Sequence, residues 1–299
     1  MSDTLASLRR KLNGADQLGS VVRAMKAVAA SSIGQYEQAV EALGQYQRSV
    51  ELGLSLCLRG ERPIAAAPAA ARDRAIGALI FGSDQGLVGR FNEVIGEFSL
   101  ETLRNLPKPK TIWAVGERVC PSLEEAGLTI TRRFAVPNSV AAITALVTEI
   151  QIEIEGYTAR ERHSEVHVFH NHPQAAARYE VTRQRLLPLD VAWRKHLTEI
   201  RWPNAQVAEV FGGAAASLPA LVHEHLFISL YKACAESLAS ENASRLEAMQ
   251  RAEKNIESVS AELRRSLNRL RQSSIDEELF DVVAGFNAYQ HSPPTHVRQ

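Results

Sequence analysis

Apolar residues recur every seven positions in two long stretches, one near each end of the chain. The first covers residues 3–59 and meets no proline before Pro63, and the second covers residues 219–289. A seven-residue repeat keeps one seam of a helix against a partner helix in a left-handed supercoil. The pattern therefore predicts two long helices that share a coiled-coil seam. The seam positions are Leu8, Ala15, Val22, Ala29, Tyr36, Leu43, Val50 and Cys57 in the first stretch, and Leu246, Met249, Ile256, Val259, Leu263, Leu267 and Leu270 in the second.

Between these stretches the pattern changes to alternating strands and helices. The apolar run 75–81, bounded by a glycine turn, is typical of a strand that is covered on both faces. The alternation predicts a doubly wound, Rossmann-like α/β sheet that ends in an antiparallel edge strand. The pattern weakens over residues 190–218, with a flexible connection expected before a helix start at Ser217 or Pro219. The other expected strands are 111–115, 128–134, 165–170 and 178–187, and the expected helices are 90–106, 117–126 and 138–155.

These elements divide the chain into four expected segments of an α/β protein. They are an N-terminal coiled-coil helix (1–62), an α/β domain with its linkers (63–216), a C-terminal coiled-coil helix (217–290) and a flexible tail (291–299). The hydrophobic content of 45% over 299 residues is enough to bury a sizeable core.

Composition narrows the classes of partner and compartment. The formal net charge is zero, so nothing global favours nucleic acid or an anionic membrane as a partner. Three widely separated cysteines without a C-x-x-C pair fit reduced thiols in the cytosol. No uncharged apolar stretch reaches membrane-spanning length, and the first residues lack the features of a signal peptide. We expect a soluble, cytosolic chain, which leaves docking on a membrane complex open.

The glycine-rich loop 82–89 follows the first strand, where phosphates bind in many α/β proteins. It contains no G-x-G-x-x-G, and Arg90 stands where a Walker A loop needs lysine followed by serine or threonine. A tight turn that packs strand against helix is therefore favoured over a nucleotide site. We expect no cofactor.

Four histidines, His163, His167, His170 and His172, surround one expected strand. His170 and His172 alternate onto one face, so a metal site is geometrically feasible. No cysteine or carboxylate pattern in the sequence completes it, which favours solvated histidines at a strand end. No Ser/His/Asp or Cys/His arrangement is readable either, so we expect neither a resident metal nor a catalytic residue.

Five segments, in order along the chain, resemble the gamma subunit of F-type ATP synthases. Residue 276 is aspartate where that family usually has threonine, and the central loop also departs from the family pattern, which points to a divergent branch. The matching segments are 23–31 (R/K-A-M-K-x-V-A-A-S), 82–92 (S-D-R-G-L-C-G-G-L-N), 184–189 (L-L-P), 236–245 (E-N-L-A-S-E-x-x-A-R) and 271–279 (R-Q-A-x-I-T-x-E-L).

The resemblance implies a non-catalytic rotor, an antiparallel coiled coil inside a ring of alpha and beta subunits. Its α/β domain would bind the epsilon subunit and the c-ring at the cytoplasmic face of the plasma membrane. Rotation of the c-ring, driven by ions, would then cycle the catalytic beta subunits. The implied contacts are Arg23, Met25, Lys26, Arg271, Gln272 and Asp276 with beta subunits, Leu279, Val282, Val283 and Phe286 as an apolar bearing tip, and Arg201 and Trp202 toward epsilon or the c-ring.

Two other functions stay open on the residues alone. One is a homo-oligomeric scaffold protein whose terminal helices form a self-contained coiled coil. The other, weaker, is a nucleotide-binding enzyme that uses the glycine loop. Assembly with alpha and beta subunits, as opposed to self-association or nucleotide binding, would separate the three.

Overall fold

A computed structural model describes most of the chain, and it divides into two compact units. The two-helix unit comprises Met1–Lys26 and Met249–Gln299, and the sheet unit comprises Ala27–Ala248. The described residues are 4–59, 74–106, 110–161, 164–174, 178–189, 191–202, 209–210 and 212–290. The elements are α1 (Leu5–Arg59), β1 (Ala75–Phe81), α2 (Phe91–Arg104), β2 (Lys110–Val115), η1 (Glu117–Val119), α3 (Cys120–Glu125), β3 (Ile130–Phe134), α4 (Val140–Arg160), β4 (Ser164–Gln174), β5 (Arg178–Leu187), α5 (Val191–Glu199) and α6 (Ala214–Gln290).

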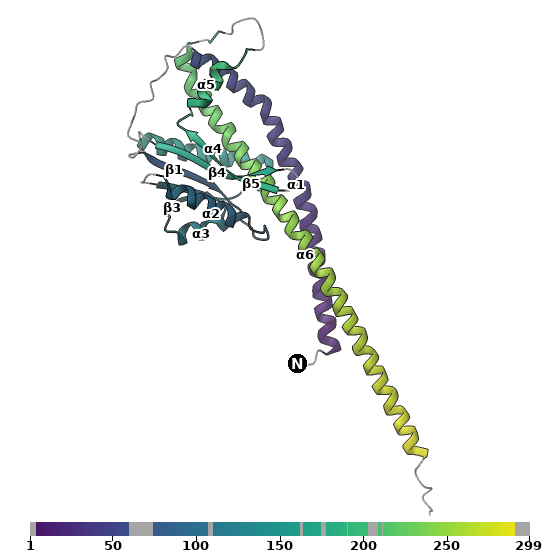
Figure 1. The fold of residues 1–299 in the computed structure, drawn as a ribbon. Helices are drawn as coiled ribbons and strands as arrows, with labels where there is room; N and C mark the ends of the chain where they lie inside the picture. Colours follow the sequence, from purple (N-terminus) through teal and green to yellow (C-terminus); the bar gives the residue numbers. More distant parts are fainter. Residues whose placement is uncertain are drawn as a thin grey trace, which may run out of the picture. The chain divides into compact units, whose positions relative to one another are not determined.

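The sheet has five strands in the order β3-β2-β1-β4-β5 (Figure 1). Strands β1 to β4 run parallel, and β5 pairs antiparallel with β4 at the edge. Every residue of the central strand β1 is buried. The predicted doubly wound sheet with an antiparallel edge strand is therefore confirmed.

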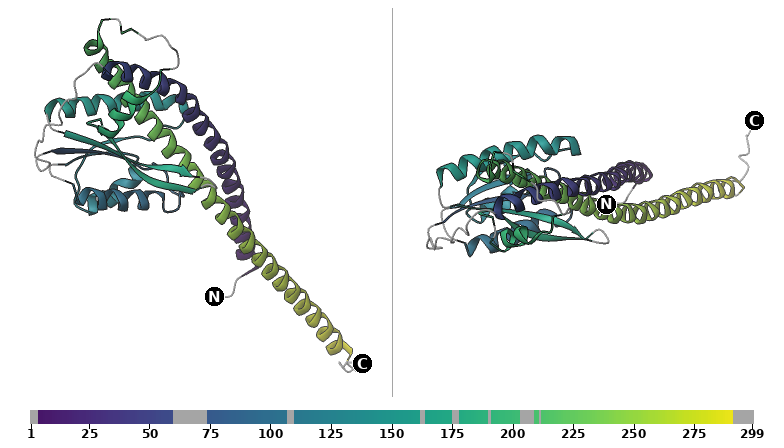
Figure 2. Two further views of the ribbon diagram at one scale, coloured as in Figure 1. Left: turned by 45° about the horizontal axis from the view of Figure 1, so that its top comes forward. Right: turned by 90° about the horizontal axis from the view of Figure 1, so that it is seen from above.

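Helices cover both faces of this sheet, as the two views in Figure 2 show. Because side chains alternate along a strand, β1 supplies both cores. Leu79 and Phe81 belong to the core formed with α4 and α6, whereas Ile76, Ala78 and Ile80 belong to the core formed with α2 and α3. The sheet unit thus has three layers.

The absence of a side chain at Gly77 lets aromatic rings pack closely on the central strand. A Cβ atom there would lie 2.7 Å from the Trp113 ring and 3.0 Å from Tyr157. Those two rings meet edge to face at 5.2 Å between centroids. Any larger residue at this position would push the rings away from β1.

In the two-helix unit, α1 and α6 run antiparallel. Lys26 contacts Glu253, Gly19 lies against Ile256, and Asp16 lies 3.4 Å from Arg264. The partner number on α6 rises as the number on α1 falls, which is the register of an antiparallel pair. This confirms the antiparallel arrangement implied by the family resemblance.

The seven-residue repeat of α1 is the buried side of that helix. Each of its seam positions is buried or half-buried, and Leu8, Ala29, Tyr36, Val50 and Cys57 are 5% exposed or less.

On α6 the predicted stripe needs two corrections, at Leu270, which is 36% exposed, and at Val259. Met249 is buried and Ile256, Leu263 and Leu267 are half-buried, but Val259 is 50% exposed. The next residue, Ser260, is 7% exposed and takes the inward place. Residues three and four positions after Ile256 both lie near its face of the helix. In α6 the fourth of these, Ser260, faces inward, and the third, Val259, does not.

Two features of residues 190–218, where the sequence pattern is weak, differ from the prediction. Helix α6 begins at Ala214, before the predicted Ser217 or Pro219, and continues through Pro219. A proline near a helix start removes only one hydrogen bond, so it did not mark the boundary. Helix α5 was not predicted. Its Leu197 is fully buried in a small core with Leu54 and Ile228.

Candidate functional site

The predicted contact residues of α1 differ in how available they are to a partner. Arg23 is exposed, and its guanidinium donates only to Ser20 Oγ one turn away, at 3.3 Å, among the hydrogen bonds of the described residues. Met25 is half-buried. Lys26 forms an ion pair with Glu253, and the two side chains are 35% and 17% exposed. Arg23 can therefore meet a partner directly, while Lys26 is already held across the helix pair.

The predicted contact residues of α6 all lie on open helix surface. Arg271, Gln272 and Asp276 are exposed. The α1–α6 register, with Asp16 beside Arg264, places the start of α1 opposite the region just before Asp276. Figure 1 accordingly shows α6 continuing past the first turn of α1.

The end of α6 carries large apolar side chains that α1 does not cover. Exposed apolar surface of this kind is common at protein–protein interaction sites. Phe280, which the sequence reading did not single out, is 73% exposed. The predicted tip residues are exposed as well: Leu279 60%, Val282 70%, Val283 48% and Phe286 60%.

Helix α1 has exposed apolar side chains that the seven-residue pattern did not reveal. Leu18 is 61% exposed and Val21 is 56% exposed. They lie three residues apart and so share one face of the helix. Apolar residues that do not fit the seam repeat are the signal that could have found them.

The remaining predicted contacts follow α5. Arg201 is exposed and Trp202 is half-buried.

The polar groups of the glycine-rich loop are used inside the sheet unit. The Ser83 backbone N–H donates to Asn92 Oδ1 at 2.9 Å. The Asp84 carboxylate accepts the backbone N–H of Glu117 at 3.0 Å and that of Val136 at 2.8 Å. Asp84 thereby ties together the segments that follow the carboxyl ends of β1, β2 and β3. These contacts support the structural interpretation of the loop.

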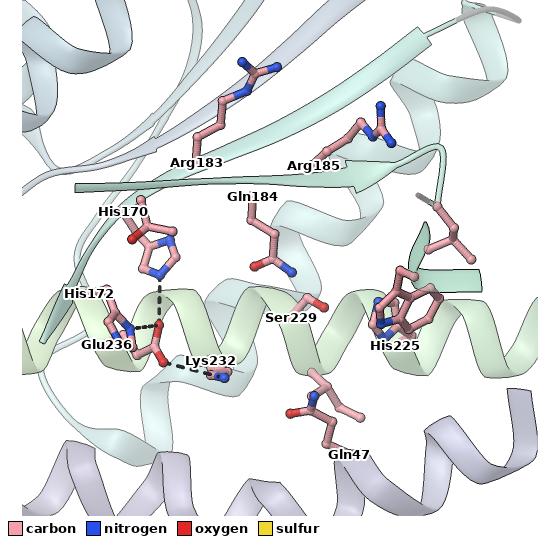
Figure 3. A pocket seen from close by; sticks show the side chains of 14 residues that line it. Gln47, His170, His172, Arg183, Gln184, Arg185, His225, Ser229, Lys232 and Glu236 are labelled. Carbon is pink, nitrogen blue, oxygen red and sulfur yellow. Dashed lines mark hydrogen bonds and ion pairs between the residues drawn. The ribbon is translucent and has the colours of Figure 1, made fainter. Parts of the chain in front are cut away.

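Two of the four histidines meet a carboxylate that the sequence pattern did not reveal. Glu236 Oε2, from α6, lies 2.9 Å from His170 Nε2 and 3.0 Å from His172 Nδ1, both from β4 (Figure 3). The side chains of His170 and Glu236 are buried, and that of His172 is 43% exposed. The expectation of solvated histidines without a carboxylate is therefore wrong for this pair, because the carboxylate comes from a distant helix.

The neighbours of Glu236 favour the ionised form of its carboxyl group. Burial would raise the pKa of its carboxyl group, but hydrogen bonds from His170 and His172 bring that pKa below its usual value. The Lys232 ammonium lies 3.8 Å from the other carboxylate oxygen. Glu236 is thus an ionised acceptor that joins β4 to α6.

His167 lies apart from this cluster, and His163 lies outside the described residues. His167 is fully buried and lies 3.2 Å from Glu165, and its ring accepts a hydrogen bond from Arg183 at 3.3 Å. Burial, with the nearby arginine charge, lowers the pKa of His167 to about 4. This ring is therefore a neutral core group near neutral pH, and the expectation of a solvated histidine is wrong for His167 as well.

The histidine–glutamate cluster lies at one end of a pocket of about 910 Å³ in the sheet unit. The pocket is lined by β4, β5, α1, α5 and α6, and its lining includes the cationic side chains of Arg183, Arg185 and Lys232. At its other end the Trp193 and His225 rings stack at 4.3 Å, and burial lowers the pKa of His225. Figure 3 shows His170, His172 and Lys232 converging on Glu236.

Comparison with known proteins gives one consistent result. The family model described as ATP synthase matches residues 4–289. The ATP synthase gamma chains of Moorella thermoacetica and Desulforamulus reducens are each 26% identical to this chain over 291 residues, covering 95% of it and 98% of each relative.

The solved structures that resemble the chain agree in fold. A chain of the Euglena gracilis mitochondrial ATP synthase superposes with a TM-score of 0.62 at 16% identity, covering 99% of both chains. A chain of the Tetrahymena thermophila mitochondrial central stalk and c-ring structure superposes with a TM-score of 0.55 at 22% identity, covering 78% of this chain and 99% of that one.

Proposed function

The chain belongs to the ATP synthase family, among relatives that are gamma chains, and we propose from this premise that it is the central-stalk subunit of a rotary ATP synthase. In this role it converts ion-driven rotation of a membrane c-ring into conformational cycling of catalytic beta subunits. The family match over nearly the whole chain is the observation that carries the proposal.

The end of α6 supports a role inside a ring of other subunits. Its apolar side chains, which α1 leaves uncovered, are suited to an apolar sleeve. Its polar residues Arg271, Gln272 and Asp276 are exposed one to two turns earlier. Together with Arg23 and Met25, these residues are the proposed contacts with beta subunits. Lys26 would act mainly through its ion pair with Glu253.

Rotation can drive chemistry in another subunit without a catalytic group on this chain. Each orientation of an asymmetric helix pair contacts one beta subunit differently from the others. A differential contact energy shifts that subunit toward one conformation. Turning the pair then moves this preference from one beta subunit to the next.

The remaining partners follow from the same proposal. The sheet unit would bind the epsilon subunit and the c-ring, with Arg201 and Trp202 as candidate contacts. None of the described helices is long and apolar enough to cross a membrane. A peripheral position at the cytoplasmic face of the plasma membrane fits this arrangement, and the proposal includes no nucleic-acid partner.

The homo-oligomeric scaffold is not favoured. In the two-helix unit α1 packs against α6 of the same chain, so the predicted seam is occupied without a second copy. The matched relatives are gamma chains along almost their whole length.

Reconstitution tests the proposal. We expect the purified chain, mixed with alpha and beta subunits from the same organism, to form a complex of one copy with three of each, measured by size-exclusion chromatography with light scattering. A nucleotide titration of the isolated chain serves as the control and should show no tight binding. A stable homo-oligomer that does not bind alpha and beta subunits would contradict the proposal of a rotor subunit and support that of a scaffold protein.

A further inference from the structure

We propose that His170, His172 and Glu236 form a binding site for a divalent transition-metal ion such as Zn²⁺. The inference rests on the sheet unit alone and holds whether or not the chain is a rotor subunit. Within the part of the chain that the structure describes, one ligand atom from each of these three residues lies within 4.8 Å of the other two.

The backbone brings the three side chains together from two rigid elements. His170 and His172 are two residues apart on β4, so they point to the same face of the sheet. Glu236 projects toward them from α6, which packs on that face. Both elements have fixed hydrogen bonds and buried neighbours, so binding an ion would require little ordering of the chain.

The distances between ligand atoms are close to those around a bound ion. Zinc bonds to nitrogen and carboxylate oxygen are about 2.0–2.2 Å long, so tetrahedral ligand atoms lie about 3.3 Å apart. The observed separations from Glu236 Oε2 are 2.9 and 3.0 Å. Because both ring nitrogens point at Oε2, the carboxylate would have to turn or withdraw by about an ångström to admit the ion at bonding distance.

The ligand set selects the class of metal. Two imidazole nitrogens with one carboxylate suit zinc and neighbouring transition metals, whereas calcium and magnesium prefer oxygen ligands. Two histidines and one glutamate are also a known zinc ligand set that leaves a fourth position open. Here that position faces the pocket that contains Lys232 and His225.

Binding would rearrange protons and one neighbouring charge. His170 Nε2 and His172 Nδ1 would each bind as unprotonated nitrogens. The proton of His170 would move to Nδ1, a buried atom without a hydrogen-bond partner among the described residues. Lys232, half exposed and 3.8 Å from the carboxylate, could turn toward solvent as the ion takes its place.

Calorimetric titration of the full-length chain with Zn²⁺ tests the site. We expect one equivalent to bind with a micromolar or lower dissociation constant. Loss of an outer-shell partner already costs roughly 10- to 100-fold in metal affinity. His172→Ala, at a partly exposed position where the fold is spared, should therefore weaken binding by at least that factor.

A control and a spectrum make the test specific to this cluster. His225→Ala, in the same pocket but away from the cluster, should leave the affinity unchanged. Co²⁺ in place of Zn²⁺ should give the visible absorption of a four- or five-coordinate ion, and this absorption should be lost in His170→Gln. No Zn²⁺ binding at micromolar concentrations, or binding that His172→Ala leaves intact, would overturn the proposal.

Discussion

The Lys26 ammonium contacts the Glu253 carboxylate across the helix pair, while the guanidinium of Arg23, one turn earlier, extends along an exposed surface. Both belong to the segment 23–31 that resembles the family motif, and nothing in that motif distinguishes their roles. The cause of the difference is a residue more than 200 positions away in the chain. The same limitation hid Glu236 from His170, because a pairing between distant elements depends on the packed fold and leaves no local pattern.

A charge swap separates the internal role of Lys26 from a role toward a partner. Lys26→Glu removes an attraction of roughly 0.2–1 kcal/mol and adds a repulsion of similar size, so it should lower the stability of the two-helix unit by at most about 2 kcal/mol. Adding Glu253→Lys should restore it. Thermal unfolding followed by circular dichroism measures both changes.

The same variants should differ in the assembled complex. We expect the swapped pair to pump ions normally per ATP and Arg23→Glu to pump less, although Arg23→Glu leaves thermal stability unchanged. Impaired pumping by the swapped pair would show that Lys26 itself contacts the catalytic ring.

At the scale of elements, the spacing of apolar residues predicted those features that depend on regular packing along one helix or strand. The α1 repeat marked the buried side of that helix correctly, because seven residues are close to two turns of a regular helix. The alternation of strands and helices predicted a doubly wound sheet with an antiparallel edge strand. The pattern failed at the seam positions Val259 and Leu270, which are exposed, and at α5 (Val191–Glu199). At these positions burial depends on what packs against the helix, as Leu197 of α5 packs against α1 and α6.

Two leucines of α1 give a matched test of the seam. Leu8 is 3% exposed and Leu18 is 61% exposed, both in the two-helix unit. Leu8→Asp would bury a carboxylate without a partner, which costs several kcal/mol or forces protonation. The first turns of α1 should therefore separate from α6. Leu18→Asp makes the same chemical change on open surface and should be nearly silent.

Hydrogen exchange of the isolated chain measures this difference. We expect Leu8→Asp to remove protection from the amides of the first turns of α1 and from the facing turns of α6, with the sheet unit unchanged. Equal protection in the two variants would mean that the seam is misplaced.

At the scale of the whole molecule, the two units carry separate parts of the proposed function. The sheet unit has its own cores on both faces of the sheet, and the two-helix unit presents the exposed end of α6. The predicted division at residues 62, 216 and 290 stays a prediction, and its boundary at 216 lies inside α6, which begins at Ala214. The tail 291–299 lies outside the described residues.

The end of α6 allows folding and assembly to be tested separately. Val282 and Phe286 are 70% and 60% exposed, so replacing both with serine removes little buried surface from the chain itself. Burying two such side chains in a partner would contribute about 1.5–3 kcal/mol each. The double variant should fold normally but bind the alpha–beta ring at least tenfold more weakly, since about 1.4 kcal/mol corresponds to a factor of ten. Glu278→Ser with Asp281→Ser changes exposed polar residues of the same turns and should bind as the unmodified chain does. Light scattering of the mixed subunits and ATP-driven ion pumping measure the two effects, and equal assembly and pumping by both double variants would contradict an apolar bearing at this end of the helix.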